Sequence, residues 1–239
     1  MTMVQNVVLP DVRKQGHDWH SLAGVIDHTV LKIDITREDV TRACEEALRF
    51  GFHTVLVNPD FVAHAKLVLH GSQVKVGSTI GYPLGATLST VKRFEAEEAL
   101  KLGADELDMV IQVGALKLGE RHIVQGEIHS LAVLAHDSGA ILKVILETPL
   151  LEEKETIFGC ALAMEAGADF VETSTGFGPV GATAKDVHLM RGVIGTKMGV
   201  KAAGGILTAA DAEMLLEAGA NRIGTSAGVA IVREFGAPE

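Results

Sequence analysis

The sequence predicts an α/β protein that folds as a single closed barrel of eight strand–helix units. The first reason is a repeated pattern in which a helix-like stretch stops at a glycine and a short apolar run follows at once. Glycine can adopt the left-handed conformation that ends a helix without a steric clash. The pattern joins 47–51 to 54–58, 100–104 to 106–110, 138–140 to 141–147, 164–168 to 170–173, and 216–220 to 222–226.

The second reason is that short apolar strands alternate with helical stretches, an order that implies parallel strands with helices outside. Eight such units close naturally as a (β/α)8, or TIM, barrel. An open doubly wound sheet is the alternative, but no G-x-G-x-x-G motif follows the first strand. Strands are expected at 23–27, 53–57, 74–80, 106–111, 141–146, 169–173, 199–202 and 221–224, and helices at 36–50, 59–69, 87–101, 116–137, 151–166, 183–195, 208–218 and 226–235.

Length and composition agree with one domain. The chain has 239 residues, of which 47% are hydrophobic, and barrels of this size are commonly a single unit. We expect residues 1–239 to form one barrel domain, with residues 1–20 as an N-terminal extension. Thr36 with Asp39, and Thr208 with Asp211, have the spacing of helix N-terminal caps.

The charge balance limits the choice of partners. A net charge of −10 argues against broad binding to nucleic acid or to anionic membranes. No apolar run is long enough to span a membrane, and residues 1–20 lack the pattern of a secretory signal. Cys44 and Cys160 lie far apart in helix-like contexts, as two reduced thiols would. We therefore expect a cytoplasmic protein that acts on a small molecule.

Polar side chains gather where the predicted strands end. In a barrel these ends form the active-site face, and polar groups in apolar strands are costly to bury unless they are paired or used. One such group by itself is as well explained by a satisfied core position, whereas the whole set indicates a site. The set is Asp27, Asn58, Asp108, Lys143, Glu147, Glu172, Thr173, Lys201 and Ser226.

Two of these residues are lysines within apolar strands. Lys201 runs into a Gly-Gly turn, and Lys143 is flanked by Leu142 and Val144. Burial lowers the pKa of a lysine and frees a neutral amine to attack a carbonyl carbon. The alternative for either lysine is a buried ion pair with Glu147 or Glu172.

Glycine-rich turns follow the last three strands and predict an anion site. They contain Gly176, Gly204, Gly205 and Gly224, and Ser226 follows the last of them. Backbone N–H groups in such loops often bind phosphate in barrels. The alternative is that these glycines only form tight turns. No metal or cofactor is expected, because the ten histidines show no ligand spacing.

These motifs together resemble the deoxyribose-phosphate aldolase family over about residues 20–235. The shared stretches are 26–32, 81–85, 104–110, 142–148, 173–177, 201–206 and 222–226. The resemblance implies a TIM barrel that reversibly cleaves 2-deoxy-D-ribose 5-phosphate into acetaldehyde and D-glyceraldehyde 3-phosphate in deoxyribose phosphate catabolism. A lysine Schiff base would carry the reaction without a metal, and the resemblance also allows for a homodimer.

The resemblance also implies roles for individual residues. Asp108 matches the acid/base aspartate, with Lys143 beside it, and Lys201 matches the second lysine, which perturbs the nucleophile. The phosphate would be held by Gly176, Gly204, Gly205, Gly224 and Ser226, and the substrate channel would be lined by Asp27, Thr29 and Thr175.

The sequence departs from the family at the decisive position. The imine-forming lysine should directly precede Thr173, and Glu172 stands there instead. A carboxylate cannot form an imine, and a glutamate beside Lys201 should favour the charged form of that lysine. In addition, Leu207 stands where an arginine is usual, which removes a cation from the phosphate end.

Three interpretations follow from Glu172. The chain is an aldolase whose activity is abolished or reduced, an enzyme with changed chemistry that uses Lys201 or Lys143 as its amine, or a sugar-phosphate binder without catalysis. The polar strand ends favour the first two.

Overall fold

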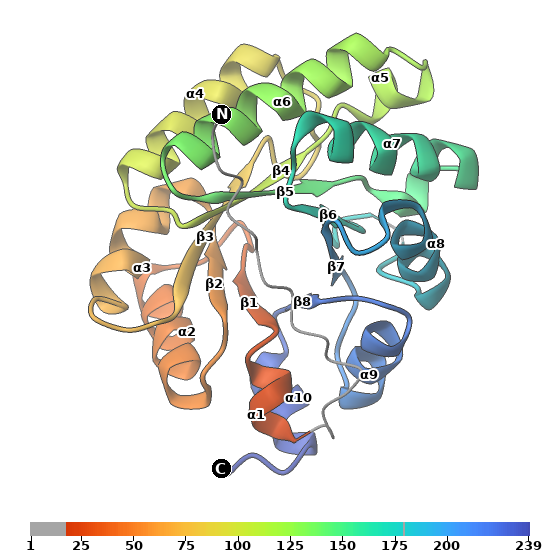
Figure 1. Cartoon of the computed structure of the whole chain (residues 1–239). Helices are drawn as coiled ribbons and strands as arrows, with labels where there is room; N and C mark the ends of the chain where they lie inside the picture. Colours follow the sequence, from red (N-terminus) through yellow and green to blue (C-terminus); the bar gives the residue numbers. More distant parts are fainter. Residues whose placement is uncertain (1–17, 179) are drawn as a thin grey trace.

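Eight parallel strands close into a barrel with helices around its outer side (Figure 1), which confirms the predicted fold. The computed structural model describes residues 18–178 and 180–239. Each strand pairs with the next one in the chain, and the last pairs with the first. The strands are β1 (Ile26–Val30), β2 (Thr54–Val57), β3 (Lys75–Ile80), β4 (Glu106–Val110), β5 (Ile141–Ile145), β6 (Phe170–Glu172), β7 (Gly199–Ala203) and β8 (Arg222–Thr225).

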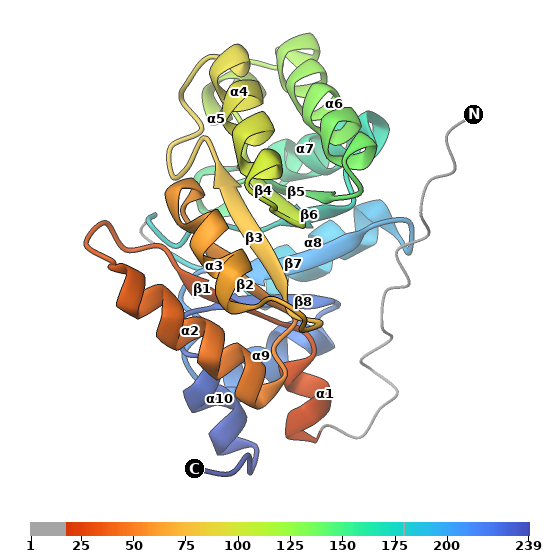
Figure 2. The same ribbon diagram turned by 90° about the vertical axis from the view of Figure 1, so that its left-hand side faces the viewer.

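Helices follow the strands and cover the outside of the barrel, as the view turned by 90° also shows (Figure 2). The α-helices are α1 (Trp19–Ala23), α2 (Arg37–Phe50), α3 (Val62–Val68), α4 (Ser89–Lys101), α5 (Val113–Lys117), α6 (Arg121–Asp137), α7 (Glu153–Ala166), α8 (Ala184–Ile194), α9 (Ala209–Glu217) and α10 (Gly228–Glu234). Two short 3-10 helices, η2 (Pro59–Phe61) and η3 (Thr148–Leu150), precede α3 and α7.

The first strand lies later in the chain than predicted. The prediction of 23–27 is wrong at both ends, because Asp18 caps a helix that continues to Ala23 and the strand runs on to Val30. Ile26 is buried in the apolar core, whereas Asp27 and Thr29, on the other face of the strand, are turned into the barrel. These inward polar residues interrupt the apolar run of the first strand, so the sequence pattern did not locate its end.

One predicted helix is two helices. The stretch 116–137 divides into α5 and α6 because Gly119 takes a positive φ of 72° between them. Positive φ is readily adopted by glycine and ends regular helix. The caps at Thr36 and Thr208 are confirmed, since each hydroxyl accepts from the backbone N–H three residues on.

The described part of the predicted N-terminal extension is short. Residues 1–17 lie outside the described part of the chain, and Asp18, Trp19 and His20 form the cap and the start of α1. Between residues 18 and 239, leaving out position 179, no helix is long and apolar enough to cross a bilayer.

Candidate active site

A cavity of about 640 Å³ opens at the carboxyl ends of the barrel strands. Its lining comes from the loops after β1, β3, β6, β7 and β8, from α2, and from residues of the strands themselves. Thr29 of β1, Leu56 of β2, Ile145 of β5, Glu172 of β6 and Ala203 of β7 contribute to it from within the strands. These residues separate the cavity from the barrel interior below.

The predicted site residues divide between the cavity and the barrel interior. The cavity is lined by Thr29, Glu172, Thr175, Gly176, Gly204, Gly205, Gly224 and Ser226. The other predicted residues, Asp27, Asp108, Lys143 and Lys201, do not line it and are fully buried within the barrel. The structure therefore places the two lysines beneath the cavity rather than on its wall.

Glycine is required at Gly204 for both conformation and space. Its φ is +95°, and a Cβ at this position would lie 2.4 Å from Ser174 Oγ. The Cβ would also lie 3.2 Å from the Cα atoms of Gly176 and Gly181. The turns after β6 and β7 therefore contact each other backbone to backbone, which keeps both close to the cavity.

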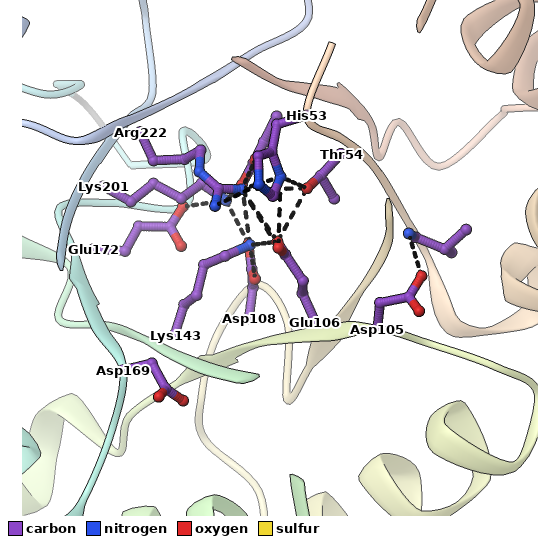
Figure 3. A network of polar contacts seen from close by, with 12 residues as sticks. His53, Thr54, Asp105, Glu106, Asp108, Lys143, Asp169, Glu172, Lys201 and Arg222 are labelled. Carbon is purple, nitrogen blue, oxygen red and sulfur yellow. Dashed lines mark hydrogen bonds and ion pairs between the residues drawn. The ribbon is translucent and has the colours of Figure 1, made fainter. Parts of the chain in front are cut away.

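Seven charged side chains fill the barrel beneath the cavity, and Figure 3 shows most of them converging from different strands. We call this set the axial cluster. It consists of Asp27 (β1), Glu106 and Asp108 (β4), Lys143 (β5), Glu172 (β6), Lys201 (β7) and Arg222 (β8). Strand register brings several of them together, because Asp108 lies beside Lys143, and Lys201 lies between Glu172 and Arg222.

Lys143 occupies the middle of the axial cluster. Its Nζ lies 3.0 Å from Asp27 Oδ2, 2.5 Å from Glu106 Oε2 and 2.9 Å from Asp108 Oδ1. Burial opposes the charge of Lys143, but these three carboxylates outweigh it and raise the pKa of the amine. Lys143 is thus held as an ammonium, and Glu147 is not among its ion-pair partners.

Lys201 lies beside Glu172 on the neighbouring strand. Its Nζ donates to Asp108 and lies 3.1 Å from Asp27 Oδ2 and 3.3 Å from Glu172 Oε1. Burial again opposes the charge, but the carboxylates of Asp108, Glu172 and Asp27 hold the pKa of Lys201 well above its usual range. This agrees with the expected effect of a glutamate beside Lys201. Glu147 does not contact this lysine and instead accepts the N–H of Thr175 at 3.0 Å.

Three residues that the sequence interpretation missed complete the lower end of the cluster. Arg222 Nη1 donates to Asp27 Oδ1 at 2.8 Å and lies 3.4 Å from Glu106 Oε2. The same nitrogen lies 2.7 Å from His53 Nδ1. Glu106 could have been found from the sequence, because it precedes Asp108 by two residues and therefore shares its face of the strand. Arg222 could have been found in the same way, because it precedes Gly224 by two residues and therefore lies on the same face of its strand.

Asp27, His53 and Glu106 place one potential metal-ligand atom each within 4.8 Å of one another. Arg222 already donates to Asp27 and His53 and lies beside Glu106. The pKa of His53 is lowered by burial and by this guanidinium, so its ring is neutral near pH 7. A fixed side-chain cation therefore fills the centre of this group.

Glu172 is the least satisfied member of the axial cluster. The residue is 2% exposed, and its Oε2 has no hydrogen-bond partner. Burial raises the pKa of its carboxyl group to about 8, with Lys201 opposing the shift and Asp108 adding to it. The attraction of Lys201 does not prevail because its ammonium is shared with Asp108 and Asp27.

A charge count gives the same result without reference to any single group. The axial cluster contains four carboxyl groups but only three cations, namely Lys143, Lys201 and Arg222. A buried, uncompensated charge is strongly unfavourable, and a carboxyl group in that position retains its proton. The cluster therefore holds one extra proton near neutral pH, and Glu172, which has a free oxygen, is where it resides.

A loop-built cavity above buried lysines and carboxylates, at the carboxyl end of a TIM barrel, is the architecture of a small-molecule enzyme. Comparison with known proteins identifies which kind. The profile of the DeoC/LacD family aldolases matches residues 22–235. The chain belongs to this family, a group of lyases of the class I aldolase type, as the sequence resemblance predicted.

Curated relatives are more than 50% identical to this chain over the matched residues. A deoxyribose-phosphate aldolase of Thermococcus gammatolerans is 57% identical over 213 residues, which cover 88% of this chain and 95% of the relative. One from Streptococcus pneumoniae serotype 19F is 53% identical over 208 residues, covering 87% and 94%.

Solved structures show the same fold. A putative deoxyribose-phosphate aldolase from Coccidioides immitis superposes with a TM-score of 0.89 at 42% identity, covering 95% of this chain and 90% of the other. The structure from Aeropyrum pernix, described as a unique tetramer, has a TM-score of 0.87 at 36% identity and covers 94% of each chain.

Proposed function

We propose that this chain binds 2-deoxy-D-ribose 5-phosphate in the cavity and that Glu172 abolishes or strongly reduces its cleavage to acetaldehyde and D-glyceraldehyde 3-phosphate. One observation carries the proposal. Glu172 lies at the cavity wall, with its Oε1 3.3 Å from Lys201 Nζ, at the position that the family resemblance assigns to the imine-forming lysine. The scaffold of an aldolase is present, and the reacting nitrogen is absent from this position.

The chemistry depends on that nitrogen. In class I cleavage a neutral amine attacks the substrate carbonyl carbon, water leaves, and the resulting iminium accepts the electron pair of the breaking C–C bond. A carboxylate at the same position cannot form the imine, so the electron pair has no sink. The expected acid/base aspartate is present beside this position, where Asp108 pairs with both Lys143 and Lys201.

Changed chemistry through Lys201 or Lys143 is less well supported. Both Nζ atoms are fully buried beneath the cavity, and each lies within 3.3 Å of carboxylate oxygens. The same carboxylates raise both pKa values, which keeps the amines protonated and without a lone pair for attack. The geometry therefore favours a lost nucleophile over a relocated one.

At the phosphate end, the proposal assigns binding to backbone groups rather than to an arginine. Gly176, Gly204 and Gly205 line the cavity with positive φ values of 80°, 95° and 72°. Turns of this kind direct N–H groups toward an anion. Leu207, where the family resemblance expects arginine, also lines the cavity, and its exposed apolar side chain supplies no cation. We therefore expect weaker phosphate binding than with an arginine.

The substitution Glu172→Lys tests the proposal. It changes the axial cluster from three cations and four carboxyl groups to four cations and three carboxyl groups, so one amine is left without a counter-charge. Such an amine loses its proton near neutral pH and becomes a nucleophile. We expect retro-aldol cleavage of 2-deoxy-D-ribose 5-phosphate to rise by about a hundredfold or more.

The matched control is Glu172→Gln, which keeps the shape but supplies no nucleophile and should stay inactive. Borohydride reduction in the presence of substrate, followed by peptide mass spectrometry, should give an adduct only in the lysine variant. No gain in a correctly folded Glu172→Lys variant would refute the proposal. An adduct on Lys201 or Lys143 of the unaltered protein would instead support the changed chemistry.

Two further expectations complete the proposal. We propose a cytoplasmic location, to which the two buried, unpaired cysteines are suited. We also propose a homodimer or a larger homo-oligomer, given the tetrameric relative from Aeropyrum pernix. Light scattering of the purified protein coupled to size-exclusion chromatography measures the oligomeric state directly.

A further inference from the structure

Three hydroxyl groups of the cavity lining present acceptor oxygens to a ligand. Thr29, Tyr82 and Ser174 all line the cavity, and each hydroxyl group donates its proton to a backbone carbonyl. The acceptors are the oxygens of Asp27 at 3.0 Å, Thr175 at 2.6 Å and Ala203 at 2.8 Å, respectively. A hydroxyl group has only one proton to donate. The three oxygens are therefore left with lone pairs for any ligand.

Glu172 adds a negative charge to this wall when it is ionised. Its Oε2 is buried and has no partner, although Oε1 lies 3.3 Å from Lys201 Nζ. Buried polar atoms in folded proteins are nearly always hydrogen-bonded, so an unpaired carboxylate oxygen beside a cavity indicates a ligand that donates to it. The axial cluster has one cation fewer than carboxyl groups. A ligand that donates to Glu172 therefore binds more tightly if the donor carries a positive charge.

The charged residues that line the outer part of the cavity also have a negative net charge. Its ionisable lining besides Glu172 and Tyr82 comprises the cations Lys32 and Arg42, the carboxylates Asp34, Asp39 and Glu46, and His28, which lies 2.7 Å from Glu46 Oε2 and is counted as neutral. Arg42 is already paired with Asp39. With Glu172 ionised, the lining as a whole carries two more negative than positive charges, which attracts small cations into the cavity.

We propose that the cavity binds a small primary amine, as its ammonium ion, with the ammonium group on Glu172 Oε2 and on the hydroxyl oxygens of the wall. An ammonium group offers three donors and no acceptor, which matches the carboxylate of Glu172 and the acceptor oxygens of Thr29, Tyr82 and Ser174. The ligand body is an amino-polyol of sugar size, because the glycine turns and Ser226 border the same cavity. The proposal shares the cavity with the proposed function but does not require the aldehyde sugar to bind.

An aldehyde is the poorer match at this position. Its carbonyl oxygen accepts but does not donate, so it gains nothing from the lone pairs of Thr29, Tyr82 and Ser174, and beside these three only a protonated Glu172 could donate to it. Replacing the expected amine by a carboxylate has thus replaced a group that reacts with an aldehyde by one that pairs with an ammonium ion. The protein now carries the group that recognises an amine, where relatives of the expected type carry the amine.

Binding of the ammonium group is coupled to release of a proton. In the free protein Glu172 faces Asp108 and Asp27, which favour its neutral form, and Lys201 and Lys143, which oppose it. Tyr82 faces it from the loop after β3, and the pKa of Tyr82 is raised further, so its hydroxyl stays neutral. Since the carboxyl pKa is about 8, an ammonium ligand must displace the proton below that pH. Affinity therefore rises as the pH approaches this value.

The test uses two ligands made from one precursor. Borohydride reduction of 2-deoxy-D-ribose 5-phosphate gives the pentitol phosphate with a hydroxyl group on C1. Reductive amination with ammonia gives the compound with an ammonium group there. Titration calorimetry on the full chain compares both ligands from about pH 6 to about pH 8, in buffers of different ionisation enthalpy. We expect the amine to bind at least about tenfold more tightly than the alcohol near pH 8.

Variants of Glu172 separate recognition from general binding. Glu172→Gln removes the charge at constant shape, so the preference for the amine should fall to about one while the affinity for the alcohol changes little. Glu172→Lys should reverse the preference, because two ammonium groups repel. The matched control is Glu217→Gln at the exposed end of α9, which should retain the full preference.

The outcomes distinguish this proposal from the proposed function. Equal affinity of the unaltered protein for the two ligands, or an amine preference that survives in Glu172→Gln, would overturn the ammonium site. Binding of the alcohol alone would overturn it and leave the proposed function standing. A folded protein that binds neither ligand would refute both. Proton release near zero at about pH 6 would also contradict a direct contact with Glu172.

Discussion

Replacing Glu172 by glutamine keeps the shape of the side chain and removes the one carboxyl group that the axial cluster cannot neutralise. Glu172 is buried, and its pKa is raised from 4.5 to about 8 by burial, with Asp108 adding to the shift. A carboxyl group whose pKa is raised on folding stabilises the protein fully below its unfolded value. That contribution is lost as the pH rises toward the folded value. The unaltered protein should therefore lose stability relative to Glu172→Gln as the pH rises.

The magnitude follows from the two pKa values. Each pH unit between them removes about 1.4 kcal/mol of folding free energy. Near pH 7 the loss is about 3 kcal/mol, and beyond about pH 8 it levels off near 5 kcal/mol. The ion pair with Lys201, 3.3 Å away, does not cancel this loss, because its attraction is already included in the raised pKa.

The assay is urea unfolding of both proteins, followed by circular dichroism, from about pH 5 to about pH 9. The measured quantity is the difference in unfolding free energy between the two proteins, so other titrating groups cancel. Glu217→Gln at the exposed end of α9 is the control and should show a flat difference. A constant difference for Glu172→Gln, or one that favours the unaltered protein at high pH, would refute the reasoning.

Two further predictions concern the cluster and the loops. Arg222→Met leaves Asp27 and Glu106 without their guanidinium, which lies 2.8 Å and 3.4 Å away, and should lower unfolding free energy by about 3–5 kcal/mol. Arg37→Met, on the exposed start of α2, should change it by less than about 0.5 kcal/mol in the same urea experiment. Gly204→Ala places a Cβ 2.4 Å from Ser174 Oγ at a φ of +95°, and should weaken pentitol phosphate binding in calorimetry by about tenfold or more. Gly192→Ala in α8, where a Cβ meets open space, should leave binding unchanged; equal losses in the two variants would contradict the role of the β7 turn.

The sequence by itself determined the barrel and its family. The evidence came from local patterns, namely glycines at helix ends, short apolar strands and the stretches around Asp108, Lys143 and Lys201. Such patterns can be read from the sequence without the tertiary structure. They also marked Glu172 as the departure, because its place before Thr173 is fixed by neighbours in the chain. Reliance on local patterns also explains why the first strand was misplaced. Its inward polar residues, Asp27 and Thr29, interrupt the apolar pattern on which the prediction relied.

Only the tertiary structure decided which charges meet. Lys143 donates to Asp27, which lies 116 residues earlier in the sequence, and Arg222 donates to Asp27 from 195 residues away. No local pattern specifies such pairs, because they depend on how closure of the barrel turns the strands toward one axis. Closure placed the lysines below the cavity rather than on its wall. It also left Glu172 to share its one cation, Lys201, with Asp27 and Asp108, because the number of charges enclosed is a property of the closed barrel.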